Sequence, residues 1–444
     1  MLGGGREECA IKARDDRRKG GEAPLRRNPI VRYFTVLGPG LVTGASDDDP
    51  SGIATYSSVG ASLGYGMLWT AIATFPLMTG VQLVCARIGL VSGRGLAGAL
   101  RQHYPHAFLY AACALLLVAN VFNIAADLAG MGDAVEMLTG VTSHVWVPLF
   151  GIVLIVVTVY TSYATFARMV KWLTAVLFAY IAATFLAKPD WHAALAASVV
   201  PSLRWETGYL EALVAVVGTT ISPYLFFWQA CQEVEEERAK GRETIAKRQG
   251  ATAQELRDAQ TDVVTGMCFS NVVMYFIILC TASTLYRAGA HEIETTRQAA
   301  EALRPLAGDG AYLLFTLGIV GTGLLAVPIL AGSASYAVSE LFRWRAGLDF
   351  RPYQAKRFYV VFAAAIAAGI ALDALKVNAV RLLFLSAVVN GLLAPPLLVL
   401  VMLVGGNKRI MGVHVNPRWL SALGWTATAV MAAAALALGI SALS

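Results

Sequence analysis

The sequence predicts an all-α membrane protein, and its composition and long apolar runs lead to this prediction. Hydrophobic residues make up 57% of the 444 residues and charged residues only 14%, and the mean hydropathy is +0.60. Apolar runs of about 20 residues recur along the chain, which is the length that an α-helix needs to cross about 30 Å of hydrocarbon. A soluble globular domain does not have this composition.

Eleven apolar runs are candidate membrane spans. In chain order they lie at 34–59, 65–92, 107–131, 145–166, 169–187, 209–231, 262–286, 310–341, 357–374, 378–404 and 419–442. The eighth run is long for one crossing, so we expect it to tilt or to extend beyond the bilayer.

Lys and Arg are distributed unevenly between the two sides that these spans define. Most of the 35 basic residues lie in the polar tail 1–30 or in loops such as "EEERAKGRETIAKRQ" and "NKRIMGVHVNPR". The positive-inside rule then predicts that the N-terminus lies inside and the C-terminus outside. We expect the protein to lie in the plasma (cytoplasmic) membrane. The tail has no apolar core and is predicted to be a disordered cytoplasmic segment rather than a signal peptide. The basic pI therefore requires no nucleic-acid partner.

Several other features point away from catalysis. The six cysteines show neither metal-binding nor disulfide spacing. No nucleotide-binding or catalytic-triad motif occurs, so we expect neither an enzyme nor a bound cofactor. The acidic and basic segment 232–260 is predicted to be a solvated cytoplasmic helix. The acidic residues predicted to be interfacial are Glu211, Asp262, Glu340 and Asp373.

Two predicted spans are interrupted near their middle by polar residues and a proline. The first contains "DDDPSG", with Asp49 before Pro50, and the sixth contains "TTISPY", with Ser222 before Pro223. Proline removes a backbone donor and frees a carbonyl, and in a membrane these groups need protein, water or a ligand as partner. Interruptions five spans apart are typical of inverted-repeat transporters, whose substrate site lies between the two unwound segments.

The chemistry of these interruptions favours a cation. A carboxylate at mid-membrane is costly unless it is paired or used, and no Lys or Arg lies in the central part of either span. The available groups are carboxylate, hydroxyl, amide and carbonyl oxygens, and we expect no Cys or Met nearby, because the nearest, Met67, lies in the next span. Such ligands suit hard cations such as Mg²⁺, Ca²⁺ or Mn²⁺.

Three stretches resemble the Nramp family of divalent metal transporters. They are "GPGLVTGASDDDPSGIATYSSVGASLGYGMLWT", "NIAADLAGMGDAVEML" and "NKRIMGVHVNP", and the resemblance extends over nearly the whole chain. It implies a LeuT-type (APC) fold of two inverted five-helix repeats, at 31–190 and 205–404, followed by an eleventh helix at 415–444. It also implies transport by alternating access.

The chain departs from the family pattern at both interruptions. The family's first-helix motif Asp-Pro-Gly-Asn reads Asp-Pro-Ser-Gly here, so Asp49 is kept and the Asn ligand becomes Gly52. The sixth-helix motif Met-Pro-His-Asn reads Ser-Pro-Tyr-Leu, so Ser222 replaces the metal-binding Met and Tyr224 replaces the His of the proton route.

Further departures concern titratable groups. The family's aspartate in the third span is kept as Asp127, but Gly130 stands where the family has a glutamate three residues later. Arg357 lies only at the edge of the ninth span, where the family has mid-helix arginines, and Asn390 stands where the family has a Gln.

Taken together, these departures favour a hydrated ion over a dehydrated transition metal. Loss of the thioether removes a soft ligand, and Mg²⁺ keeps much of its water. Loss of the His, Glu and Arg removes the chain of titratable groups that a proton symporter needs. The pattern resembles the Nramp-related magnesium transporter branch, which implies Mg²⁺ transport, with Mn²⁺ also accepted, without proton coupling. The residues predicted to bind the metal are Asp49, Ser51, Gly52, Thr219, Ser222, Tyr224 and Asn390, and those predicted to line its vestibule are Asp47, Asp48 and Asp127.

Two alternatives remain open from the sequence. One is proton-driven import of Mn²⁺ or Fe²⁺, as is usual in the family. The other is an amino-acid or organic-solute carrier on the same fold, which the Asp triplet disfavours because it would repel a substrate carboxylate. The expected partners are divalent metal ions and the lipid bilayer; the sequence indicates no oligomeric state, and a monomer is compatible with it.

Overall fold

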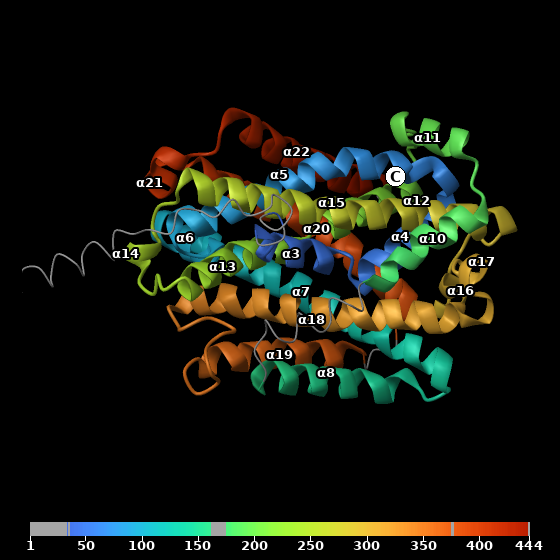
Figure 1. Cartoon of the computed structure of the whole chain (residues 1–444), viewed down its shortest axis with the longest axis horizontal. Coiled ribbons are helices and arrows are strands. Elements are labelled where there is room, and N and C mark those ends of the chain that lie inside the picture. Colours follow the sequence, from blue (N-terminus) through green and yellow to red (C-terminus); the bar gives the residue numbers. More distant parts are fainter. Residues whose placement is uncertain (1–32, 34–35, 161–174, 374–376, 443–444) are drawn as a thin grey trace, which may run out of the picture.

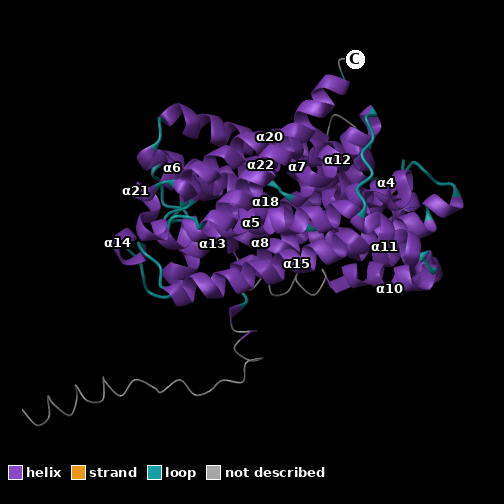
Figure 2. Ribbon diagram, turned by 90° about the horizontal axis from the view of Figure 1, so that it is seen from above, coloured by secondary structure: helices purple, strands orange, loops and turns teal. Residues whose placement is uncertain are grey.

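The protein is all-helical in the part of the chain that the structure, a computed structural model, describes. These residues are 33, 36–160, 175–373 and 377–442, and no strand occurs among them (Figure 2). The predicted tail 1–30 lies outside the described residues, as does the junction of the predicted fourth and fifth spans.

Single helices, most of them long, correspond in order to nine of the predicted apolar runs. They are α5 (Leu68–Ser92), α7 (His106–Thr139), α8 (Ser143–Tyr160), α10 (Phe178–Ala187), α15 (Ala253–Thr284), α18 (Ala311–Phe342), α19 (Lys356–Asp373), α20 (Ala379–Gly406) and α22 (Arg418–Ser441). Two pairs of shorter helices take the places of the first and sixth runs, and they are α3 (Pro39–Asp47) with α4 (Pro50–Leu63), and α12 (Thr207–Thr220) with α13 (Pro223–Ala239).

Short helices lie between the long ones. The α-helical ones are α6 (Leu96–His103), α11 (Trp191–Val199), α14 (Ile245–Arg248), α16 (Thr296–Glu301), α17 (Arg304–Ala307) and α21 (Lys408–Met411). The 3₁₀ turns are η1 (Gly64–Met67), η2 (Ala175–Leu177), η3 (Tyr286–Ala288), η4 (Gly308–Gly310) and η5 (Gly412–His414).

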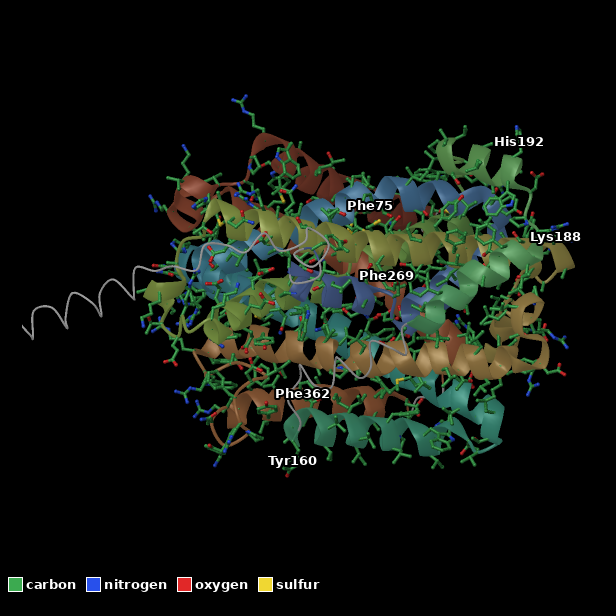
Figure 3. The ribbon with its side chains drawn as sticks, viewed as in Figure 1. Phe75, Tyr160, Lys188, His192, Phe269 and Phe362 are labelled. Carbon is green, nitrogen blue, oxygen red and sulfur yellow. The ribbon has the colours of Figure 1, made fainter. Side chains whose placement is uncertain are left out.

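The long helices run side by side along the long axis of the molecule, so the bundle has two ends (Figure 1). One end carries α6, α14 and α21 and is called the α14 end below; the other carries α11, α16 and α17 and is called the α11 end. Lys188 and His192 lie at the α11 end, whereas Phe75 and Phe269 lie along the length of the bundle (Figure 3). Polar ends and an apolar middle are what a bilayer requires.

Eight helical segments of the described chain are long and apolar enough to cross a membrane. They are Pro50–Ser92, His106–Thr139, Ser143–Tyr160, Thr207–Ala239, Ala253–Ala288, Arg304–Phe342, Ala379–Gly406 and Arg418–Ser441. The apolar helix α10 is shorter. An integral membrane protein is therefore confirmed, while the number of eleven spans and the orientation of the termini stay predictions.

Both predicted interruptions are confirmed. The chain leaves helical geometry between Asp47 and Pro50, and again between Thr220 and Pro223. In each case proline occupies the first position of the second helix, where its missing N–H costs no helical hydrogen bond.

The two broken helices lie antiparallel in the middle of the bundle. α4 packs against α12 and α3 packs against α13. α4 leads through η1 towards the α11 end, whereas α13 leads towards the α14 end. The two broken helices therefore run in opposite directions. The four broken ends therefore meet at the centre, as an inverted-repeat transporter requires.

Asp262 of α15 holds the beginning of α3. Its carboxylate accepts hydrogen bonds from the backbone amides of Gly38 (2.8 Å), Gly40 (2.6 Å) and Leu41 (3.0 Å). α3 has no capping side chain of its own, because its N-cap residue is Gly38. Asp262 is only 2% exposed, so its role is that of a helix cap supplied by a neighbouring helix.

We expect Asp262→Ala to destabilise the protein by about 2–3 kcal/mol, because it leaves three amides at a helix N-terminus without their charged acceptor. Thermal unfolding of the purified protein measures this effect. Asp309→Ala is the control, since the Asp309 side chain is 99% exposed. Equal unfolding temperatures for the two variants would contradict this role of Asp262.

The acidic side chains that follow the sixth span differ from the prediction. Glu233, Glu235 and Glu237 are 4%, 7% and 1% exposed, so the predicted solvated helix is wrong for these three. The outer part of α13 is packed among neighbouring helices and buries them, and neighbouring cations compensate two of them. Arg238 pairs with Glu235 at 2.9 Å, and Arg242 pairs with Glu237.

Candidate functional site

The candidate site lies where the four broken helix ends meet. At the ends of α3 and α12, backbone carbonyls point to the site without a helical hydrogen-bond partner. At the beginnings of α4 and α13, backbone amides do the same. Asp49 is the N-cap of α4, and its Oδ1 accepts a hydrogen bond of 2.6 Å from the Gly52 amide. The local sequence explains this turn, because Asp is a preferred N-cap and Pro50 is suited to the first helical position.

Three oxygen atoms surround Gly52. A β-carbon added at this glycine would lie 3.3 Å from the Asp47 carbonyl oxygen and 3.3 Å from Thr219 Oγ1. It would also lie 3.4 Å from Asp49 Oδ1. Thr219 Oγ1 is buried and has no hydrogen-bond partner in the described part of the chain. A carbonyl, a hydroxyl and a carboxylate oxygen thus converge, at 3.3–3.4 Å, on the position that a side chain at Gly52 would occupy, and this position is called the space at Gly52 below.

The hydroxyl groups of Ser222 and Tyr224 tie the broken ends together. Ser222 Oγ lies 2.6 Å from the Thr219 carbonyl oxygen and 3.3 Å from that of Gly218. Tyr224 donates its hydroxyl hydrogen to the Ser46 carbonyl at 2.8 Å. Both side chains are 1% exposed, so they are central, as predicted, but each holds a helix end as well as facing the site.

Asp47 and Asp48 face α15 rather than α12. Ser270 Oγ lies 2.7 Å from Asp47 Oδ2 and 3.3 Å from Asp48 Oδ1. Their other carboxylate oxygens are buried and have no hydrogen-bond partner among the described residues. Sequence reasoning missed Ser270, because a single serine in an unbroken apolar helix carries no signal of its own.

Asp127 on α7 is fully buried and lies within electrostatic range of Asp49. Neither of its carboxylate oxygens has a hydrogen-bond partner in the described structure. One turn earlier, Asn123 is also fully buried, and both of its side-chain polar atoms lack partners there. Sequence reasoning missed Asn123, although its spacing from Asp127 in "NIAAD" places both residues on one face of α7.

Ser51 and Asn390 are buried as well. Ser51 Oγ has no hydrogen-bond partner among the described atoms, and the same holds for the side-chain nitrogen of Asn390. Asn390 lies on α20, which packs against both α4 and α12. No recorded hydrogen bond joins Asn390 to the other predicted ligands within the described chain.

Two methionines lie closer to the site than the sequence indicated. A β-carbon added at Gly323 would lie 2.7 Å from Met131 Cγ and 3.2 Å from Pro50 Cγ, so Met131 packs near the break in the first helix. The Met274 sulfur lies 3.7 Å from the Thr220 hydroxyl oxygen. The expectation that no sulfur lies near the site is therefore wrong, because α7 and α15 bring in residues far from both interruptions.

The site is closed on all sides. None of its predicted ligand or vestibule side chains is more than 1% exposed, and in the described ranges no three His, Cys, Asp or Glu side chains are arranged to hold a metal ion. An ion between the broken ends would therefore depend on carbonyl, hydroxyl or water oxygens beside one or two carboxylates.

Comparisons with known proteins agree with this architecture. Residues 40–441 match the family described as natural resistance-associated macrophage protein-like, or Nramp. A relative from Pseudomonas aeruginosa, named divalent metal cation transporter MntH 1, is 28% identical over 428 residues, covering 94% of this chain and 93% of the relative. A divalent metal cation transporter MntH from Granulibacter bethesdensis is 25% identical over 420 residues, covering 91% and 86%.

Solved structures show the same fold. The manganese transporter of Eremococcus coleocola matches with a TM-score of 0.72 and 18% identity, covering 95% of this chain and 88% of that one. Mhp1, a nucleobase-cation-symport-1 family transporter, matches with a TM-score of 0.56 and 13% identity, covering 90% of each chain. The predicted LeuT-type fold is thereby confirmed. This chain belongs to the Nramp family of membrane transporters and is not an enzyme.

Proposed function

We propose that this protein carries divalent metal cations across the membrane by alternating access, that Mg²⁺ is its principal substrate with Mn²⁺ also accepted, and that transport does not require protons. The single observation that carries the proposal is the space at Gly52, which is bordered by the Asp47 carbonyl, Thr219 Oγ1 and Asp49 Oδ1. Oxygen ligands of this kind suit hard cations, and Mg²⁺ in particular is held with part of its water. The names of the matched relatives support divalent metals as the class of substrate.

Asp127 supports the same proposal. Its two carboxylate oxygens, which have no hydrogen-bond partner among the described residues, lie at the centre of the bundle, and a carboxylate at mid-membrane is costly unless it is used. A hydrated ion offers water hydrogens to such oxygens without direct coordination. We therefore assign Asp49 as the carboxylate nearest the ion and Asp127 as an acceptor for its water.

A second candidate function is proton-coupled import of Mn²⁺ or Fe²⁺. The matched structure of a manganese transporter favours it, and so do Met131 and Met274, whose thioether side chains pack beside the breaks in the first and sixth helices. Thioether ligands favour transition metals over Mg²⁺.

Uptake into proteoliposomes separates the two candidates. If the affinities for Mg²⁺ and Mn²⁺ lie within about tenfold of each other, about tenfold excess Mg²⁺ should reduce the uptake of Mn²⁺, supplied at a saturating concentration, by about half or more. A pH-sensitive dye inside the vesicles should show no acidification during metal entry. Mn²⁺ uptake that is insensitive to Mg²⁺, or acidification that tracks it, would establish the second candidate instead.

The orientation of the protein belongs to this proposal. Basic residues are concentrated at the α14 end, in α6, the outer part of α13, the loop at 343–357 and α21. We therefore place the α14 end on the cytoplasmic side. Labelling of a cysteine introduced at exposed Val413, next to α21, with a membrane-impermeant reagent in intact cells tests this assignment: no labelling is expected.

A further inference from the structure

A cavity of about 1120 Å³ opens at the α14 end, outside the site between the broken helices. Its walls are α6, the outer part of α13, the end of α18 and the loop that follows α18. None of the residues predicted to bind the metal lines it. Six arginines do, namely Arg94, Arg101, Arg238, Arg248, Arg343 and Arg345.

The most buried carboxylates of the cavity already have hydrogen-bond or ion-pair partners within the protein. Glu340 accepts hydrogen bonds from the amides of Gly95 (2.8 Å) and Gly98 (2.9 Å), so both of its oxygens cap the beginning of α6. Glu235 pairs with Arg238. The two remaining carboxylates that line the cavity belong to exposed residues at its rim. The cavity therefore offers little to a cation.

Two arginines of its walls, by contrast, form no ion pair with a carboxylate among the described residues. Arg248 is 4% exposed and donates to the carbonyl oxygens of Gly93 (3.3 Å), Arg242 (2.9 Å) and Glu243 (2.6 Å). Burial lowers the pKa of the Arg248 guanidinium, as expected for a charge that neutral dipoles compensate only in part. Arg94 Nε is buried without any hydrogen-bond partner in the described part of the chain.

Two further arginines stand at the opening. Arg343 and Arg345 are exposed, and neither forms an ion pair within the described ranges. The guanidinium of Arg345 lies over the ring of Phe350, 5.2 Å from its centroid, which keeps the side chain beside the cavity. Positive charge thus extends from the buried wall to the opening.

We propose that this cavity binds a phosphate-bearing anion, either the headgroup of an anionic phospholipid or a soluble phosphate ester of similar size. Guanidinium groups donate paired hydrogen bonds that match phosphate oxygens, and several arginines around one cavity suit a group with multiple acceptors. The volume is that of a small-molecule site rather than of a single inorganic ion. Basic pockets between helices at the cytoplasmic membrane surface are suited to lipid headgroups.

An occupant would connect the cavity with the transport site. α13 lines the cavity and begins at the central break, so an anion held there ties the outer end of α13 to α6 and α18. The site would thereby influence the movement of one half of a broken helix without contacting the transported metal.

The test is binding to the purified full-length protein in neutral detergent. Phosphatidylglycerol and glycerol 3-phosphate are titrated separately. Phosphatidylcholine is the control lipid, because its choline group neutralises the charge of its phosphate. The shift in unfolding temperature gives the apparent affinity. We expect phosphatidylglycerol, glycerol 3-phosphate or both to bind, and R94Q/R343Q/R345Q to weaken this binding at least about tenfold. The control is R351Q, which removes an exposed arginine that does not line the cavity.

The outcomes distinguish the source of the phosphate. Binding of phosphatidylglycerol alone identifies the membrane leaflet as the source, whereas binding of glycerol 3-phosphate identifies a soluble ester. Equal binding of phosphatidylcholine, equal affinity of wild type and triple variant, or no binding of either probe would overturn the proposal. R343Q/R345Q repeats the test with two exposed side chains alone, should the triple variant fail to fold.

Discussion

Asp49→Asn is expected to reduce divalent metal uptake by at least about 100-fold, because loss of a buried charged ligand removes about 3 kcal/mol or more of binding. The substitution preserves the shape of the side chain, and Asn caps helices as well as Asp does. The hydrogen bond from the Gly52 amide is therefore kept, and the unfolding temperature should change little. Metal uptake into proteoliposomes and thermal unfolding measure the two effects separately.

Asp190→Asn is the matched control. Asp190 is the N-cap of α11 and accepts a hydrogen bond of 3.0 Å from the Ala193 amide, but it is exposed at the α11 end. The same chemical change there should leave uptake unaltered. Full uptake by Asp49→Asn would remove Asp49 from the proposed site.

Gly52→Ala is expected to lower metal uptake about tenfold or more. A methyl group added where the metal ion or its water binds should weaken binding by about 1–3 kcal/mol, the usual cost of overpacking. The added methyl group would occupy the space that an ion or its water needs between the Asp47 carbonyl and Thr219 Oγ1. Alanine is favoured over glycine within a helix by up to about 1 kcal/mol, which offsets part of the crowding in the folded protein. The variant should therefore fold while transporting poorly.

Gly208→Ala provides the comparison for this substitution. Gly208 lies in α12, one of the four broken-helix segments, and a β-carbon there would meet nothing within 4 Å. We expect normal uptake from Gly208→Ala. If Gly52→Ala also transports normally, the cation passes elsewhere.

The sequence was sufficient to predict the centre of the molecule, because its signals are local. Proline after polar residues within an apolar run breaks a helix wherever the run is placed, so both interruptions were predicted with their central residues. Asp49 was singled out from the three adjacent aspartates by its place in the Asp-Pro motif that resembles the Nramp family, which is also a local signal.

The groups that other helices contribute could not be predicted in this way. Ser270, Met274 and Asp262 all lie on α15, which is unbroken and gives no sign of which face meets α3 and α4. Close packing of backbones decides this, since a β-carbon at Gly40 would lie 2.6 Å from the Val263 nitrogen. Such a contact joins residues more than 200 positions apart and has no local signal.

The acidic stretch after the sixth span shows the same limit. Adjacent charges are usually solvated, and the sequence alone therefore favoured an exposed helix. Glu235 and Glu237 are instead buried, with arginines as partners. Only the packing of the outer part of α13 among its neighbours reveals this pairing.

The cap formed by Asp49 has a consequence for the half of the cycle in which no metal is carried. If transport is uncoupled from protons, as proposed, the empty carrier must reorient to begin another round, and an uncompensated charge at the centre would oppose that step. The Gly52 amide, 2.6 Å from Asp49 Oδ1, and the positive end of α4 stay with this carboxylate when the cargo leaves. These partial positive charges lower the free-energy cost of the Asp49 carboxylate at the centre, so part of the compensation for its charge remains when no metal is bound.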